Sequence, residues 1–293
     1  MSPSALRPLP PPGATHVLGV LNLTPDSFSD GGQFVSGDLG RERVDADAAL
    51  AHAARLVADG AAMLDVGAVS TRPGSHAPPP LAEWARLAPV LAALRAAVAV
   101  PISLDTTRAA VLRRALEAGA VDVLNDVSAL GEDPEMAATA AAAGLPVILM
   151  HRRGTPATMQ DAPRYADAPR EVRDELLAAV ARAQAAGVAR ERILLDPGLG
   201  FGKRVEDNVA LLAALPALRA MGHRIVVGAS RKAFLGALTG RPTADREHAT
   251  TAVTVLAALA GADFVRVHDA RAAADALAVA RAVWAATSRP GGR

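Results

Sequence analysis

The sequence predicts an α/β fold: a single (β/α)8 TIM barrel with a disordered N-terminal tail and a short C-terminal tail. Short apolar segments alternate with longer helical segments, and eight such pairs follow one another along the chain. Alternation of this kind is typical of parallel strands joined by helices, and eight units of strand and helix close naturally into a barrel. A length of 293 residues is also ordinary for one barrel of this type.

The chain divides into three predicted regions. Residues 1–13, MSPSALRPLPPPG, are rich in proline and are expected to form the disordered tail. The barrel is expected to span residues 14–287, and residues 288–293 form a short polar tail. Within the barrel, residues 24–40 are polar and rich in glycine. A loop of that length inside a compact domain is usually a lid or a disordered segment.

Each predicted strand is a short apolar run that stops at or near a polar residue or a glycine. These strands are residues 16–23, 62–67, 101–105, 121–125, 146–151, 193–196, 224–228 and 263–267. The predicted helices are residues 41–59, 81–98, 107–118, 134–143, 171–187 and 205–215, then helices between residues 230 and 260 and a last helix that ends near residue 286. Trp84, in the second of these helices, is expected to be a core residue.

A polar side chain stands at or just beyond the end of every predicted strand. These residues are Asn22, Asp65, Asp105, Asn125, His151, Asp196, Ser230 with Lys232, and Arg266 with His268. Packing alone does not explain such a set, and the opposite ends of the strands carry no comparable one. Because the active sites of (β/α)8 barrels form at the C-terminal ends of the strands, the sequence predicts one site at this face.

The segment ILLDPGLGFGK, residues 193–203, is the most informative part of this ring. A buried strand stops at Asp196, and a proline with three glycines then forces a sharp turn with an open backbone. Such a carboxylate is a fixed acceptor for a ligand, although an aspartate in this position can also simply cap the next helix. The chain has only two lysines, Lys203 and Lys232, both in glycine-bearing loops after strands. This use of lysine indicates that a compact point charge is needed there.

The ring offers the groups that bind a flat heterocycle. Asp105, Asn125, Asp196 and Lys232 together supply acceptors, an amide and one cation. A carboxylate accepts two parallel N–H bonds from the edge of an aminopyrimidine, so this set suits a ligand of that kind.

A second group of residues suits a polyphosphate. Asn22, Arg266 and His268 lie on the first and last strands, which become neighbours when the barrel closes. Their amide oxygen, guanidinium and imidazole predict a polyphosphate clamp with Mg²⁺, which takes few protein ligands and several phosphate oxygens. The segment from Ser230 to Lys232 begins a helix, whose N–H groups favour an anion such as a carboxylate.

Composition excludes several other functions. The net charge of +1 gives no electrostatic case for nucleic acid or an acidic membrane as a partner. The absence of cysteine excludes disulfides, thiolate zinc sites and a cysteine nucleophile. No apolar run approaches the roughly 20 residues of a membrane span, and no apolar signal segment follows the N-terminus. A cytoplasmic protein is therefore expected.

Motif searches for other enzyme classes give little. Glu247 and His248 lack a second histidine at helical spacing, so they do not form a zinc motif. The glycine run at residues 198–202 is a weak signal for a dinucleotide, and the sequence GxxxxGK[ST] does not occur.

Eight motifs, spread over nearly the whole predicted barrel, resemble those of dihydropteroate synthase, an enzyme of folate synthesis. They are LNLTPDSFSDGG (21–32), DVGAVSTRPG (65–74), ISLDTTR (102–108), LNDVSA (124–129), LMHRRGTPATMQ (149–160), DPGLGFGK (196–203), GASRKAFLG (228–236) and FVRVHD (264–269). The order of TPDSFSDGG, SRK and RVH is close to diagnostic for this family. The resemblance implies the condensation of 6-hydroxymethyl-7,8-dihydropterin diphosphate with p-aminobenzoate, which gives 7,8-dihydropteroate and diphosphate.

The resemblance also implies roles for individual residues. The pterin edge would be held by Asp105, Asn125, Asp196 and Lys232, with Met150 and Arg266 on the faces of the ring. Asn22, Arg266 and His268 would hold the diphosphate, and Asn22 would be the protein ligand of Mg²⁺. The p-aminobenzoate site would be lined by Thr71, Arg72, Pro73, Phe201 and Ser230, and Arg231 would be a further substrate-binding residue. Loops 24–40 and 70–74 would close over the substrates, and the late helices would form a homodimer.

Three positions depart from the family pattern. The usual GGES reads Gly67-Ala68-Val69-Ser70 here, so that a carboxylate is lost beside a catalytic loop. Arg152 replaces the second methionine of the usual MHM, and Ala233 replaces the serine that commonly follows SRK. Val69 keeps open the alternative of a pterin-binding paralogue with little or no synthase activity. A folate-type methyltransferase on a related barrel and a barrel without a site fit the motifs and the polar strand ends less well.

Overall fold

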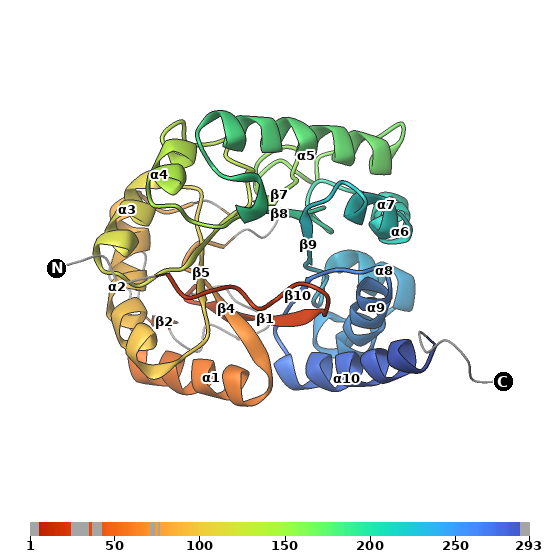
Figure 1. Ribbon diagram of the computed structural model, residues 1–293, viewed down its shortest axis with the longest axis horizontal. Coiled ribbons are helices and arrows are strands. Elements are labelled where there is room, and N and C mark those ends of the chain that lie inside the picture. The colour runs from red at the N-terminus through yellow and green to blue at the C-terminus, as the bar shows by residue number, and fades with distance from the viewer. Residues whose placement is uncertain (1–5, 25–34, 37–42, 71–73, 76, 288–293) are drawn as a thin grey trace.

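The computed structural model describes residues 6–24, 35–36, 43–70, 74–75 and 77–287, and its main feature is a closed barrel of parallel strands. The barrel consists of β1 (His16–Asn22), β4 (Ala61–Gly67), β5 (Ile102–Asp105), β6 (Val123–Asp126), β7 (Val147–Met150), β8 (Ile193–Asp196), β9 (Arg224–Val227) and β10 (Phe264–Val267). Strand β1 pairs with both β4 and β10, which closes the ring. The predicted barrel is therefore confirmed (Figure 1).

Helices surround the strands on the outside (Figure 1). They are α1 (Ala46–Ala58), α2 (Pro80–Ala97), α3 (Ala109–Glu117), α4 (Met136–Ala142), α5 (Ala168–Ala185), α6 (Val205–Ala213), α7 (Leu215–Arg219), α8 (Ala233–Thr239), α9 (Glu247–Leu259) and α10 (Ala270–Thr287), with short 3-10 turns at Arg190–Arg192 and Thr243–Asp245. None of the helices in the described parts of the chain is long and apolar enough to cross a membrane.

Two helix predictions differ from the structure. The first helix was expected from residue 41, but Arg43–Val44 forms strand β3, which pairs antiparallel with β2 (Val35–Ser36). Helix α1 starts later because the side chain of Asp45 caps it by accepting a bond from the N–H of Ala48 at 2.9 Å. The helix expected at 205–215 ends at Ala213, and Pro216 stands at the start of the separate helix α7.

The core has two parts, as a (β/α)8 barrel requires. Inside the barrel, alternate strand residues form a fully apolar cluster that consists of Leu18, Met63, Val123, Ile148, Leu194, Val226 and Phe264. A larger apolar cluster fills the space between the strands and the helices, and Trp84, expected in the core, is only partly buried against the edge of this cluster. Because side chains fill the interior of the barrel, only residues at the ends of the strands can contact a ligand.

The N-terminal ends of the strands carry buried charges, contrary to the expectation that they hold no comparable polar set. Asp122 accepts bonds from the N–H of Ile102 at 2.9 Å and from Arg95 at 2.5 Å. Asp263 accepts bonds from the N–H of Ile225 at 2.9 Å and from Arg224 at 3.1 Å. These carboxylates are satisfied by backbone and arginine groups of the same end, so their role is structural.

Residues 6–13 pack against this same end of the barrel, so the prediction that they are disordered is wrong. The N–H of Arg7 donates to Asp122 at 2.7 Å, and its guanidinium donates to the carbonyl oxygen of Val100 at 2.8 Å. Leu9 packs against the apolar cluster inside the barrel, and Leu6 packs against the outer cluster. The proline-rich composition therefore reflects an extended covering segment; residues 1–5 and 288–293 lie outside the described residues.

Candidate active site

An arginine between two carboxylates forms the centre of the C-terminal face. The Nε atom of Arg266 donates to Asp65 at 2.6 Å, and its NH2 group donates to Asp105 at 3.0 Å. Asn125 donates from its amide to the same oxygen of Asp65 at 3.0 Å. Closure of the barrel brings these residues from β4, β5, β6 and β10 together, although they are far apart in the sequence. Gly67 permits this packing, because a Cβ there would lie 3.2 Å from the Cβ of Asp105.

The surroundings of Asp105 make its charge costly. Burial and the nearby negative charge of Asp65 together raise the pKa of Asp105 to about 7, against the opposing effect of Arg266. Asp65 itself was predicted only as a strand-end residue, without a role. Its function as the acceptor for Arg266 and Asn125 depends on which strands become neighbours, and no local sequence signal shows that.

Asp196 lies at the end of β8, where the chain turns sharply. Its Oδ1 atom accepts a bond from the N–H of Gly198 at 2.7 Å, which closes a tight turn. Burial raises the pKa of Asp196 to about 6, against the effect of the Gly198 N–H and of the cations Arg266 and Lys232. Helix α6 has its own cap from Arg204 and Asp207, so Asp196 does not serve as a helix cap. The use of this carboxylate by a ligand stays a prediction.

The loop after β8 lies directly on the end of β7. Gly198 has a φ of +65°, and a Cβ at this position would come 1.9 Å from the carbonyl oxygen of His151. Gly202 has a φ of +59°, and its Cβ would come 2.6 Å from the carbonyl oxygen of Arg153. Only glycine fits such a contact between two backbones. The glycines predicted to open the backbone therefore serve to bring two loops together.

Three of the predicted substrate residues meet above this loop. Met150 and Phe201 belong to one small apolar cluster with Val127 and Met159. The Nζ atom of Lys232 lies 3.7 Å from the centre of the Phe201 ring, a cation–π contact. Gly228 leaves space beside the carboxylate, because a Cβ there would be 3.6 Å from Oδ2 of Asp196. The structure thus places an apolar wall and a cation next to Asp196.

The remaining predicted residues are only partly brought together. The hydroxyl oxygen of Ser230 lies 2.8 Å from Nδ1 of His268, so these two form one unit. Arg231 has a φ of +56°, and its Nε atom lies 3.2 Å from Glu247 of α9, so its guanidinium is directed to that helix. Asn22 ends β1, whose neighbours are β10 and β4, which confirms that it shares a region with the last strand.

Several predicted residues cannot be placed. Thr71, Arg72 and Pro73 lie outside the described residues, as do most of loop 24–40 and part of loop 70–74. Among the residues that the structure does describe, no group of three or more histidine, cysteine, aspartate or glutamate side chains could hold a metal ion.

Two of the three departures from the family pattern line one cavity of about 340 Å³ beside Asp105. Val69 and Arg152 both face it, and Arg152 pairs with Glu132 at its wall. The neighbouring loop is held from behind, because Arg86 of α2 donates to the carbonyl oxygen of Ala68 at 2.7 Å. The backbone that carries Val69 is therefore fixed by contacts that do not need a carboxylate at that position.

Comparison with known proteins agrees with this arrangement. The model of the pterin-binding enzyme family matches residues 18–268. The dihydropteroate synthase of Mycobacterium leprae is 48% identical to the chain, and the match covers 90% of the chain and 92% of that protein. The chain belongs to the dihydropteroate synthase family.

Solved structures of dihydropteroate synthases have the same fold. The Yersinia pestis enzyme, solved with a sulfonamide drug complex, is 38% identical, with a TM-score of 0.89 and coverage of 96% of this chain and 99% of that one. The Xanthomonas albilineans enzyme in complex with 7,8-dihydropteroate is 40% identical, with a TM-score of 0.80 and coverage of 93% and 95%. The family's barrel is therefore retained over nearly the whole of this chain.

Proposed function

We propose that the chain condenses 6-hydroxymethyl-7,8-dihydropterin diphosphate with p-aminobenzoate, with release of diphosphate and formation of 7,8-dihydropteroate. The observation that carries this proposal is the buried Asp196 with Lys232 and Phe201 beside it and the Arg266 centre next to it. The carboxylate suits the aminopyrimidine edge of a pterin. The Xanthomonas albilineans relative was solved with 7,8-dihydropteroate, the product expected here.

The residues of the site act by binding and electrostatic stabilisation. The amine of p-aminobenzoate is a weak nucleophile, so the reaction depends on how well the leaving diphosphate is stabilised. Arg266 and His268 lie at the end of β10 and are assigned to this negative charge, with Asn22 on the adjacent strand. Asp196 and Asn125 orient the pterin so that its exocyclic carbon faces the amine. As the C–O bond to diphosphate breaks, the electron-rich dihydropterin stabilises the positive charge on its exocyclic carbon. The amine nitrogen forms the new C–N bond and loses one proton to the released diphosphate or to water, so no general base from the protein is required.

We infer that Mg²⁺ accompanies the diphosphate and that Asn22 is its protein ligand. The amide oxygen of Asn22 is the kind of hard donor that Mg²⁺ accepts, and phosphate oxygens and water would complete the six ligands. When bound, the ion would neutralise charge on the leaving group. Calorimetric titration of Mg²⁺ into the protein with bound pterin diphosphate tests this inference. A Kd for Mg²⁺ that is unchanged in Asn22→Ala would contradict it.

The test of the proposed reaction is a direct one. Purified protein is incubated with dihydropterin diphosphate, p-aminobenzoate and Mg²⁺, diphosphate is measured, and the pteroate product is identified by mass. Release that depends on p-aminobenzoate is the expected result and shows that Val69 is tolerated. Release without p-aminobenzoate, or none at all, would overturn the proposal.

One alternative has a specific observation in its favour. Val69 removes a carboxylate from the cavity beside Asp105, which fits a paralogue that binds pterin without turnover. In that case calorimetry would detect pterin binding, no product would form, and Val69→Glu would be the variant to test for restored activity.

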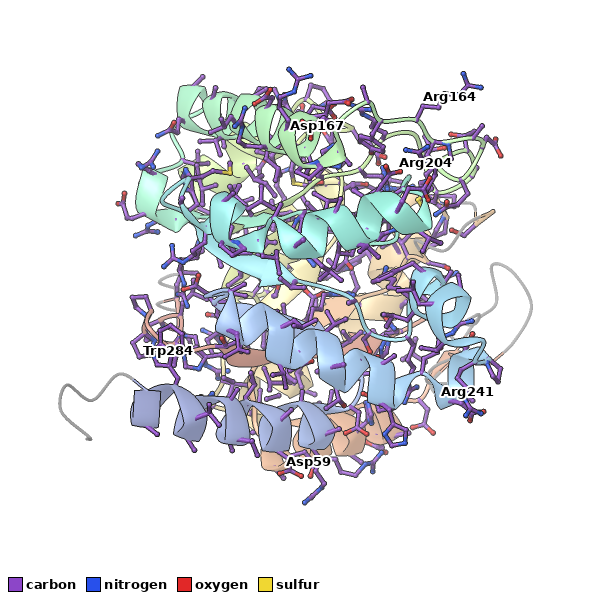
Figure 2. All side chains as sticks on the ribbon, turned by 90° about the vertical axis from the view of Figure 1, so that its right-hand side faces the viewer. Asp59, Arg164, Asp167, Arg204, Arg241 and Trp284 are labelled. Atoms are coloured by element: carbon purple, nitrogen blue, oxygen red, sulfur yellow. The ribbon has the colours of Figure 1, made fainter. Side chains whose placement is uncertain are left out.

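We further propose that the chain forms a homodimer through α9 and α10. These helices expose large apolar side chains: Leu256, Leu259, Val279, Val283 and Trp284. Trp284 is 60% exposed on the outside of the molecule (Figure 2), and side chains of this size are enriched at interfaces. Sedimentation equilibrium should give a dimer for the wild-type protein and a monomer for Trp284→Asp; a monomeric wild-type protein would contradict the proposal. A cytoplasmic location stays a prediction from the sequence.

A further inference from the structure

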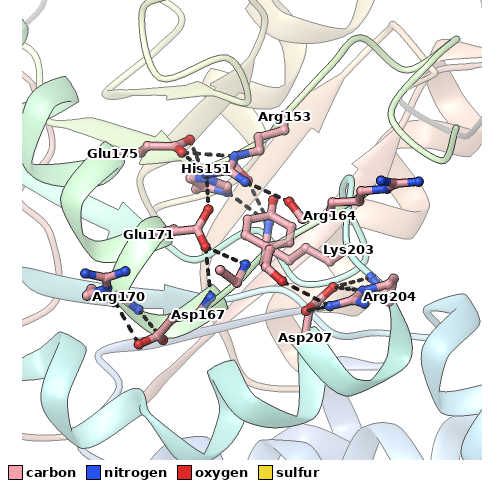
Figure 3. Close-up of polar contacts among 12 residues, drawn as sticks. His151, Arg153, Arg164, Asp167, Arg170, Glu171, Glu175, Lys203, Arg204 and Asp207 are labelled. Carbon is pink, nitrogen blue, oxygen red and sulfur yellow. Dashed lines mark hydrogen bonds and ion pairs between the residues drawn. The ribbon is translucent and has the colours of Figure 1, made fainter. Parts of the chain in front are cut away.

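Lys203, the first of the two lysines in the chain, is buried beneath the site and takes no part in the proposed reaction. It is 4% exposed, and its Nζ atom lies among acceptors. It donates to the carbonyl oxygens of Gly198 at 2.9 Å and Phe201 at 3.0 Å, and it lies 3.0 Å from Nδ1 of His151. Figure 3 shows Lys203 beside His151, and His151 in turn in contact with Glu175 of α5.

The contacts of His151 decide which of its two ring nitrogens carries the proton. Its Nε2 atom lies 2.9 Å from Glu175. The bond with His151 lowers the pKa of Glu175 to about 2, so this carboxylate is an acceptor and Nε2 carries the proton. Burial lowers the pKa of His151 to about 4, so the ring is neutral and Nδ1 is an acceptor. Lys203 must therefore donate to Nδ1 as well.

Three close acceptors, with the carbonyl oxygen of His151 as a fourth at 3.4 Å, surround the Nζ atom of Lys203 and call for three N–H groups. Burial lowers the pKa of Lys203 to about 7, so the ammonium predominates below that pH. A neutral amine has only two, so the geometry requires the ammonium form. A lysine suits this position better than an arginine, because a compact charge reaches three converging acceptors that a planar guanidinium cannot. The charged and titratable groups around it come from several elements: His151 at the end of β7, Arg153 in the loop that follows, Glu175 of α5, Asp196 of β8 and Lys232 at the start of α8.

The carbonyl groups held by Lys203 belong to residues that shape the substrate pocket. Gly198 closes the turn at Asp196, and Phe201 packs with Met150. The two lysines of the chain thus lie on opposite sides of Phe201: Lys203 holds its backbone, and Lys232 contacts its ring. We propose that Lys203 is a positioning residue, a buried ammonium that fixes Phe201 for p-aminobenzoate. This role rests on the proposed synthase function.

Loss of the Lys203 ammonium should weaken the binding of p-aminobenzoate more than the binding of the pterin. The main chain of Asp196 is held by its strand, since its carbonyl oxygen accepts a bond from the N–H of His151 at 2.9 Å, and the N–H of Gly198 holds its side chain. Phe201 lies further along the loop, and its carbonyl oxygen accepts a bond from Lys203 instead. Loss of the ammonium should therefore displace Phe201 and leave the pterin carboxylate near its position.

The first experiment compares Lys203→Met with Arg173→Met, which removes the same charge from an exposed site on α5. We expect Lys203→Met to raise the KM for p-aminobenzoate at least tenfold and to change the Kd for pterin less than threefold. Hydrogen exchange of the peptide that contains residues 197–203 should become faster, while peptides elsewhere and the Arg173→Met control stay as in the wild type. An unchanged KM, or equal losses for both substrates, would overturn the proposal. If Lys203→Met does not fold, Lys203→Gln is judged by the same criteria.

The second experiment needs no activity and uses the wild-type protein. Because the chain has only two lysines, ¹⁵N-lysine labelling gives two side-chain signals, and Lys232→Ala assigns them. At pH 6 the Lys203 signal should show three attached protons that exchange slowly with water. A neutral amine or fast exchange at that pH would refute the buried ammonium. If the wild-type protein has no synthase activity, this measurement and the exchange data still test the inference independently.

Discussion

At the scale of single residues, the site contains two carboxylates whose ionised forms are disfavoured by burial. Asp105 and Asp196 are both buried, and burial raises the pKa of each well above its usual range. Arg266 lies between Asp65 and Asp105, so its positive charge reduces the free-energy cost of burying these two carboxylates. A ligand that offers N–H groups to Asp196 would favour its ionised form, so binding and ionisation are coupled at this residue.

Removal of the Asp196 charge should weaken pterin binding sharply. In Asp196→Asn one charged acceptor is lost, which costs about 1.5–3 kcal/mol and corresponds to a roughly 10- to 150-fold higher Kd. Lys232→Ala should also weaken binding, because it removes the cation beside the pocket. Calorimetry with pterin diphosphate measures both, and Asp174→Asn, exposed on α5, is the control. Near-normal binding by both site variants would contradict the assignment.

Pterin affinity should depend on pH through the same group. The ionised form of Asp196 accepts the N–H bonds, and its pKa is about 6. The Kd should therefore fall as the pH rises through 6, and Asp196→Asn should lose this dependence. The unfolded chain releases the proton near its ordinary pKa of about 4, so the contribution of Asp196 to stability declines as the pH rises from about 4 to about 6. A Kd that is constant from pH 5 to 7.5 would refute this prediction.

At the scale of elements, the loops after β7 and β8 act as one unit. Gly198 and Gly202 bring the two backbones into contact, and Lys203 joins them through His151. Glu175 and Arg153 extend this unit to helix α5, with Arg153 Nε 2.9 Å from Glu175. The position of Phe201 in the pocket wall therefore depends on contacts with both the loop after β7 and helix α5.

A methyl group at Gly198 should break this unit. Gly198→Ala combines a positive φ with a clash against His151, while Gly240→Ala, at a φ of +71°, has open space around it. We expect the control to lose about 1 kcal/mol from its left-handed backbone alone and Gly198→Ala to lose several times more or to misfold. Urea unfolding of both variants measures the difference, and equal losses would show that the backbone contact is unimportant.

Sequence reasoning succeeded for this fold where the signal is local. The polar residue at each strand end and the alternation of apolar runs are both visible in the chain, and they located the barrel and its active face. The pairing of Arg266 with Asp65 and the inward direction of Lys203 depend on contacts between distant strands, so they were missed. Residues 6–13 were misjudged because proline content does not distinguish a free segment from one that lies extended on a surface.

At the scale of the whole molecule, the two ends of the barrel use charge differently. The C-terminal end holds carboxylates whose neighbours leave room for a ligand. The N-terminal end pairs Asp122 and Asp263 with arginines and backbone N–H groups, and residues 6–13 cover it. We therefore assign the C-terminal end to ligand binding and the N-terminal end to the stability of the fold.

Removal of the covering segment should therefore destabilise the protein without a direct effect on the site. A variant that lacks residues 1–13 loses the Arg7 bonds and the packing of Leu6 and Leu9, which should cost about 2–4 kcal/mol. A variant that lacks only residues 1–5 keeps every one of these contacts and is the control. Urea unfolding is the measurement; equal stability of the two truncated proteins would show that the segment contributes nothing.

The contact between Gly198 and the carbonyl of His151 also limits how this protein can evolve. A lineage under selection by a competitor of p-aminobenzoate can alter side chains such as Phe201 one at a time. It cannot replace Gly198 or Gly202 without a simultaneous shift of the loop after β7, which needs several mutations at once. Escape variants should therefore accumulate around these glycines and spare the glycines themselves.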